Sequence, residues 1–134
     1  MSLKACSLGA ILMVAVAVPA LAHHSFAMFD QAKIVTVKGT VKELEWVNPH
    51  SWLRVMIADQ ASGKELQWAF EMSSPGTMTR LGMTPETVKP GDTVTVTYHP
   101  LKDGSRGGQF MQALLPNGQT AVRREGGPNL KEQD

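Results

Sequence analysis

The sequence is short of cysteine, of charge of one sign and of long apolar runs, and each shortage excludes a class of protein. Its single cysteine, Cys6, lies near the amino terminus, so the remainder of the chain has neither a disulfide nor a thiol nucleophile. Lysine and arginine number 13 against 12 acidic residues, and no basic run stands out. This balance argues against partners such as nucleic acid or an anionic lipid surface.

Catalytic signatures are also missing. The sequence contains no nucleophile motif, no glycine-rich phosphate loop and no paired acids at a recognisable spacing. We therefore expect a binding protein and not an enzyme.

The amino-terminal stretch has the composition of a cleaved signal peptide. Lys4 supplies the positive charge, the run from Leu8 to Val18 is apolar, and Ala20-Leu21-Ala22 offers small residues to a peptidase after Pro19. The alternative is an uncleaved anchor, but this run is shorter than the roughly 20 apolar residues that span a bilayer. We predict a leader over residues 1–22, and export to the periplasm or out of the cell with no stable membrane insertion after cleavage.

Cleavage after Ala22 would remove Cys6 and Lys4 with the leader. Of the 13 basic side chains 12 would remain, against 12 acidic ones. A chain of this size forms one small domain, which we expect to be a monomer. Because no disulfide can stabilise it, the fold has to depend on a packed core.

Alternating apolar residues predict five strands in the rest of the chain. The first is long, starts at Ile34, and contains Gly39 and a change of phase after Lys42, which are typical of a bend or bulge. The other four are predicted at residues 52–57, 66–70, 93–98 and 109–115. Polar turns separate them, and none of the histidines falls inside a predicted strand.

A short helix is predicted between the third and fourth strands. Ser74 is a suitable N-cap, Pro75 suits the first helical position, and Gly82 suits the end. Three strands, a helix and two strands are typical of a mainly β, five-stranded OB-like Greek-key barrel, which binds ligands through its second and third strands and its loops. An antiparallel sandwich without closure is the alternative. The predicted regions are an N-terminal His-His segment over 23–33, the barrel over 34–122 and a flexible tail over 123–134.

Four histidines are the candidate metal ligands. His23 and His24 would begin the mature chain, His50 lies in the predicted loop between the first and second strands, and His99 begins the loop between the fourth and fifth. In an OB-like barrel these two loops contact ligands. A terminal histidine offers its α-amine together with its ring nitrogen, an arrangement that resembles the histidine brace of copper enzymes. Nitrogen-rich sites favour Cu(II), so copper is the expected cofactor.

The histidines can also be explained without a metal ion. The histidines at the terminus can be part of a frayed segment, and those in the loops can donate to turn carbonyls. The alternative function is a metal-independent interaction module that holds a peptide, a glycan or a protein partner. Its candidate residues are Trp52 and Arg54 on the second strand and Glu71 at the end of the third. Glu71 is also a candidate carboxylate ligand, general base or helix cap.

The other prominent side chains are interpreted as core. Trp68 and Phe70 alternate on the third strand and are expected to anchor the interior. Methionine fills irregular cores, and we expect this role for the six that follow the leader: Met28, Met56, Met72, Met78, Met83 and Met111.

A combination of short motifs resembles a family of small exported bacterial proteins of unknown function. The motifs are AHHSF at 22–26, GxV at 39–41, WxNPHxW at 46–52, WxxE at 68–71, SP at 74–75, PGD at 90–92 and HPxxxG at 99–104. The resemblance implies that the three histidine positions occur together in such proteins. It adds no function of its own.

Overall fold

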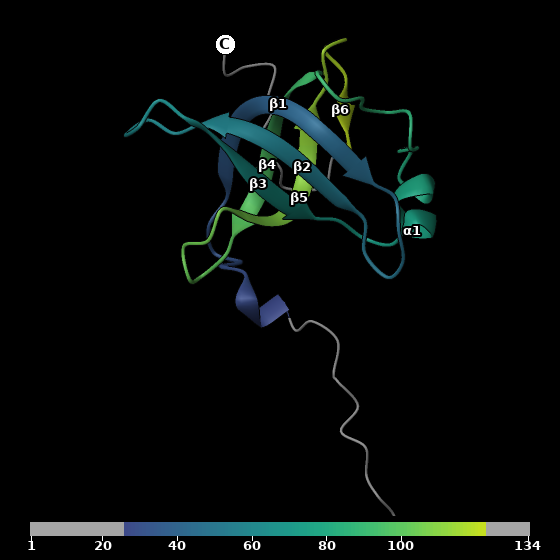
Figure 1. Ribbon diagram of the computed structural model, residues 1–134. Coiled ribbons are helices and arrows are strands. Elements are labelled where there is room, and N and C mark those ends of the chain that lie inside the picture. Colours follow the sequence, from purple (N-terminus) through teal and green to yellow (C-terminus); the bar gives the residue numbers. More distant parts are fainter. Residues whose placement is uncertain (1–25, 123–134) are drawn as a thin grey trace, which may run out of the picture.

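The computed structural model describes residues 26–122, which form a small β-barrel with one helix (Figure 1). The predicted leader, His23, His24 and the tail over 123–134 lie outside the described residues. In chain order the elements are the 3-10 turn η1 (Phe26–Met28), β1 (Val35–Glu45), β2 (Trp52–Ala58), β3 (Glu65–Glu71), α1 (Pro75–Arg80), β4 (Thr93–Pro100), β5 (Gly107–Leu114) and β6 (Thr120–Ala121).

Pairing around the sheet closes the barrel. The strands follow the order β3-β2-β1-β4-β5-β6, and a parallel pairing between β3 and β5 joins the two sides. The five-stranded OB-like barrel predicted from the sequence is therefore confirmed, and closure excludes the open sandwich. The two-residue strand β6 was not expected. It pairs with the end of β5, where Ala113 and Leu114 face Ala121 and Thr120.

The first strand bends so that it serves both sides of the barrel. Residues 35–40 of β1 pair with β4, and residues 40–45 pair with β2. The register shifts between Val41 and Glu43, which is the bulge that the change of phase predicted. A side chain at Gly39 would overlap the carbonyl oxygen of Met56, so glycine permits the two strands to lie this close.

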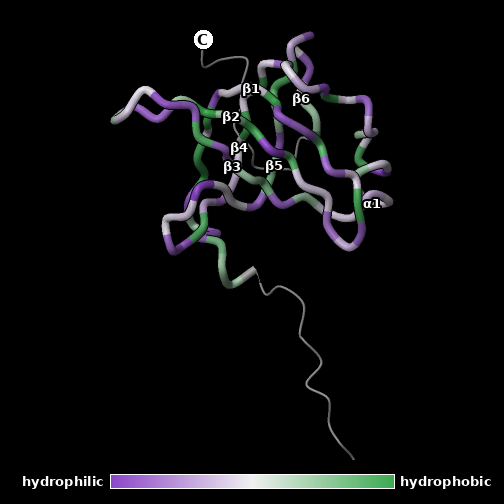
Figure 2. Tube along the Cα trace, viewed as in Figure 1, coloured by the Kyte–Doolittle hydropathy of each residue, from purple (hydrophilic) through white to green (hydrophobic). Residues whose placement is uncertain are grey.

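The helix α1 begins as predicted and closes one part of the core. The Ser74 side chain accepts a hydrogen bond from the Thr77 backbone N–H, and Pro75 follows it. Met78 on the inner side of α1 is buried, and it joins a core that includes Leu53, Phe70 and Val96. Figure 2 shows the apolar residues concentrated along the strands, whereas the β2–β3 and β4–β5 loops are largely hydrophilic.

Two interpretations of the side chains need correction. Met72, Met78, Met83 and Met111 are buried, as expected of core residues, but Met56 is only half-buried because it alternates with the inward residues of β2, and Met28 is 43% exposed because it lies in the N-terminal segment outside the barrel. Trp68 is only partly buried, although it packs against the core. Phe70 is fully buried and does anchor the interior.

Candidate functional site

The loop between β1 and β2 holds His50 beside the end of β3. Two backbone hydrogen bonds fix the following residue, from Ser51 N–H to the Ser73 carbonyl (3.1 Å) and from Met72 N–H to the Ser51 carbonyl (2.9 Å). The Asn48–Pro49 peptide bond that precedes His50 is cis. His50 lies in the first loop, as its place in the sequence predicted.

The His50 ring points at the end of β3. Its Nδ1 lies 3.2 Å from the Met72 carbonyl oxygen and 3.4 Å from Glu71 Oε1. A carbonyl oxygen only accepts, so Nδ1 has to carry the proton in this contact. In the neutral ring the lone pair is then on Nε2, which is the arrangement usual for a histidine that binds a metal ion. Glu71 is 8% exposed and contacts His50, whereas Ser74 caps the helix.

Four side chains from four strands form what we call the cross-strand row: Trp52, Glu71, Gln109 and His99. Trp52 pairs with Glu71 across β2 and β3, Glu71 with Gln109 across β3 and β5, and Gln109 with His99 across β5 and β4. Directly paired residues point to the same face of a sheet. Their neighbours Leu53, Phe70, Phe110 and Tyr98 are buried in the core, so the row lies on the outer face of the barrel.

His99 lies inside a strand, which corrects the prediction that it begins a loop. β4 continues through His99 to Pro100, because the outer-face position of His99 pairs with Gln109 and Pro100 pairs with Gly108 at the strand end. The imidazole Nδ1 donates to the Lys33 carbonyl oxygen at 2.7 Å. As in His50, this donation leaves the lone pair of the neutral ring on Nε2.

The segment before β1 is bound along the same edge. Gln31 donates its side-chain N–H to Gln109 Oε1 (2.8 Å), Asp30 N–H bonds to the Pro100 carbonyl (2.8 Å), and Lys102 N–H bonds to the Met28 carbonyl (3.0 Å). Figure 1 shows η1 beside the loop that joins β4 and β5. Residues 30–33, which precede β1, therefore lie beside Gln109, His99 and Pro100.

Gln109 was missed in the sequence. A glutamine next to two glycines at the start of a strand carries no signal of a site by itself. Its importance comes from pairing on both sides, with Glu71 and with His99, and it is 8% exposed.

Arg54 forms ion pairs with two acidic side chains of β1. Its Nε donates to Glu45 Oε1 at 2.7 Å and lies 3.4 Å from Glu43 Oε1. The hydrogen bond from the Arg54 guanidinium lowers the pKa of the Glu45 carboxyl below its ordinary value, and it raises the pKa of Arg54. Of the predicted ligand-face residues, Trp52 and Glu71 thus lie in the cross-strand row, while Arg54 is bound in an ion pair.

Within residues 26–122, no three histidine, cysteine or acidic side chains are close enough to hold a metal ion. His50 reaches Glu71, but His99 lies two strands away from Glu71, which corresponds to about 10 Å between Cα atoms. His23 and His24, the other two predicted ligands, are outside this range. The helices described are too short and too polar to cross a membrane.

Comparison with known proteins identifies a family whose function is unknown. The sequence model of a family described as a family of unknown function, DUF6152, matches residues 10–111. No curated protein and no solved structure matches the chain.

Proposed function

Because the chain belongs to the DUF6152 family, whose function is unknown, we propose a function from its own residues: it is an exported protein that binds Cu(II). Two ligands are the α-amine and the ring nitrogen of His23. The third is a ring nitrogen of His24, or of His50 or His99 on the barrel. The first 22 residues direct export, and their removal creates the amine.

One observation supports this proposal above the others. The segment that follows the two terminal histidines is bound to the cross-strand row through Gln31 and Gln109, and to His99 through the Lys33 carbonyl. Two residues lie between His23 and Phe26, so the three Cα–Cα steps that join them span at most about 11 Å. Under this proposal a terminus of this length reaches the barrel end that carries His99, because the Met28 carbonyl is already bonded to Lys102 there.

The donor set suits copper. Imidazole and amine nitrogens in a tetragonal arrangement favour Cu(II), which is also the divalent ion that such ligands bind most tightly. The backbone carbonyls that accept from His50 and His99 fix each ring, as outer partners of metal-binding histidines do. Glu71 beside His50 supplies negative charge that favours a nearby cation. Bound copper would contribute a Lewis-acidic or redox-active centre, and the residues above would orient it.

The free amine is tested by changing only what precedes His23. Protein that starts at His23 is compared with protein that carries one additional methionine before it, in Cu(II) titrations followed by electron paramagnetic resonance. We expect a nitrogen-dominated spectrum for the first. The second should bind at least about tenfold more weakly, which is the lower end of the effect of losing an outer partner of a metal site. Equal affinity and an equal spectrum would exclude the amine as a ligand.

Substitution of the barrel histidines tests the third nitrogen. His99→Gln and His50→Gln are made separately in protein that starts at His23, with His24→Gln as the test of the neighbouring ring. We expect one of the three variants to lose nitrogen coupling and affinity. If all three retain both, the barrel does not contribute and the site is confined to the terminal residue.

The interaction module of the sequence analysis stays as the second hypothesis, with Trp52 as its central residue. It needs no metal. A partner that binds equally well to metal-free and copper-loaded protein, and less well to Trp52→Ala, would favour it over the copper proposal.

A further inference from the structure

A second candidate site lies next to the loop that joins β2 and β3, at the opposite end of these strands from the cross-strand row. A cavity of about 380 Å³ is lined by Val37, Ile57, Ala58, Asp59, Gln60, Leu66, Trp68 and Arg106. Its volume is in the range of small-molecule binding pockets. It shares no residue with the cross-strand row or with the histidines, so it is independent of the copper proposal.

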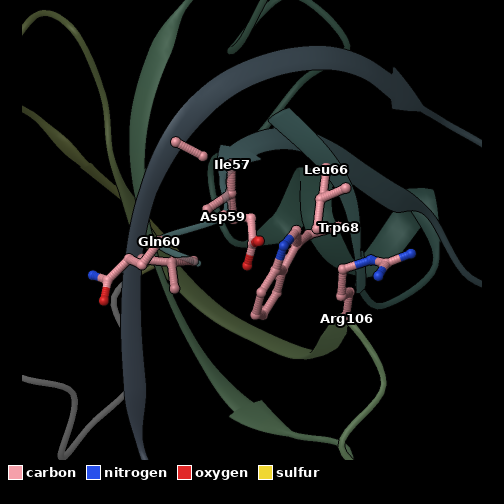
Figure 3. Close-up of a pocket in the computed structure, with 8 residues that line it drawn as sticks. Ile57, Asp59, Gln60, Leu66, Trp68 and Arg106 are labelled. Atoms are coloured by element: carbon pink, nitrogen blue, oxygen red, sulfur yellow. The ribbon is translucent and has the colours of Figure 1, made fainter. Parts of the chain in front are cut away.

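The walls of this cavity are apolar and its aromatic ring is held in place. Val37, Ile57 and Leu66 supply aliphatic surface. The Trp68 indole stacks toward Phe70, with ring centroids 6.5 Å apart, and it meets the Tyr98 ring edge-on at 6.2 Å. Figure 3 shows the indole projecting into the cavity. Because both supporting rings are buried, their packing restrains the rotation of the indole.

One acidic side chain, Asp59, and one basic side chain, Arg106, line the cavity. Asp59 accepts hydrogen bonds at Oδ2 from the Ser62 hydroxyl (2.6 Å) and from the Ser62 backbone N–H (2.9 Å). These bonds lower the pKa of the Asp59 carboxyl, and the positive charge of Arg106 lowers it further, so the group is ionised at neutral pH. In Figure 3 the Asp59 carboxylate lies next to the indole, whereas the Arg106 guanidinium points away from it.

We propose that this cavity binds a small organic cation with an apolar shell, such as a quaternary ammonium compound. An ammonium group over the face of a tryptophan is attracted by the ring quadrupole, and the Asp59 carboxylate adds charge complementarity. The methyl groups of such a cation pack against Val37, Ile57 and Leu66. A strongly hydrated inorganic cation would gain nothing from these walls.

Choline and 3,3-dimethyl-1-butanol have the same shape, but only choline is charged, so comparing their binding isolates the effect of the charge. Both are titrated into metal-free protein while the Trp68 indole N–H signal, assigned by Trp68→Phe, is followed by nuclear magnetic resonance. We expect a saturable shift with choline and at least a roughly threefold weaker effect with the isostere, as for one exposed charge interaction. No saturable shift with choline, or equal effects of the two compounds, would overturn the proposal.

Charge variants test which side chain recognises the ligand. Asp59→Asn keeps an acceptor for Ser62 and removes the charge, so choline affinity should fall by about twofold to fivefold. Asp103→Asn is the matched control, because Asp103 accepts the Ser105 backbone N–H in a similar turn (2.9 Å) outside the cavity. It should leave choline affinity unchanged.

Arg106→Gln removes the cation at the rim, and it should leave choline affinity unchanged or raise it. Benzoate tests the opposite polarity. If benzoate shifts the Trp68 signal more strongly than choline, and Arg106→Gln abolishes that shift, the cavity is a site for anions and the proposal is wrong.

Discussion

The closure of the barrel depends on Gly107, and Gly107→Ala tests this directly. The backbone of Gly107 has φ of 135°, a conformation that residues with a side chain rarely adopt. A Cβ at this position would also overlap the Ala69 carbonyl oxygen on β3. Alanine therefore forces β5 away from β3, and with it Gln109 away from Glu71.

The cost can be estimated from the pairs that would be lost. β3 and β5 pair at three positions, Ala69–Gly107, Phe70–Gly108 and Glu71–Gln109. Losing two or three backbone hydrogen bonds of about 1 kcal/mol each, in addition to about 1–2 kcal/mol for the backbone conformation, gives a loss of about 4 kcal/mol in the free energy of unfolding. That is a large part of the stability of a small domain.

Gly104→Ala, in the β4–β5 loop just before β5, is the matched control. Gly104 also has a positive φ of 78°, but a Cβ there would meet nothing within 4 Å. It should lose only the conformational part, about 1–2 kcal/mol. Urea unfolding followed by tryptophan fluorescence measures both variants. If Gly107→Ala is no less stable than Gly104→Ala, the close approach of β5 to β3 does not limit the fold and the reasoning is refuted.

Three further predictions concern the core, the helix and the pH dependence of stability. Phe70→Ala should lower the free energy of unfolding by about 3–5 kcal/mol, since Phe70 is fully buried; a loss below 1 kcal/mol in urea unfolding would contradict its place in the core. Ser74→Ala removes the acceptor for the Thr77 N–H and should cost about 1 kcal/mol, whereas Ser74→Asn should cost almost nothing by the same assay. Glu45→Gln tests the Arg54 pair: because the pKa of Glu45 is lowered from its ordinary 4.5, the pair stabilises above that pH and its contribution is lost as pH falls through the folded pKa. The stability difference between wild type and Glu45→Gln should therefore shrink in acid, and a constant difference would exclude the pair as its source.

Local patterns in the sequence predicted most of the barrel. Period-two alternation located the start of β1 and both ends of the other four main strands to within two residues, and the break in that period after Lys42 located the bulge of β1. Ser74 and Pro75 located the helix start, because capping chemistry depends only on neighbouring residues.

The cross-strand row could not be predicted, because it depends on register between strands that are distant in sequence. Glu71 becomes a neighbour of Gln109 only when the parallel β3–β5 pair closes the barrel, whereas Gln109 and His99 pair across the β4–β5 hairpin. The predicted fourth strand ended two residues before the end of β4, because a proline usually argues against a strand. At the last position of a strand, however, the sheet does not need the backbone N–H that Pro100 lacks. Trp68 likewise looked like a core residue by alternation, and the cavity beside it requires three-dimensional packing.

The central claim is that export creates a histidine terminus that binds copper, and one measurement tests both parts. The protein is recovered from the medium or periplasm of the cells that export it, and native mass spectrometry gives its mass and its metal content. The account predicts a chain that begins at His23 and carries one copper ion. A chain that begins at any other residue, or one that begins at His23 and takes up no copper when Cu(II) is supplied, would contradict it.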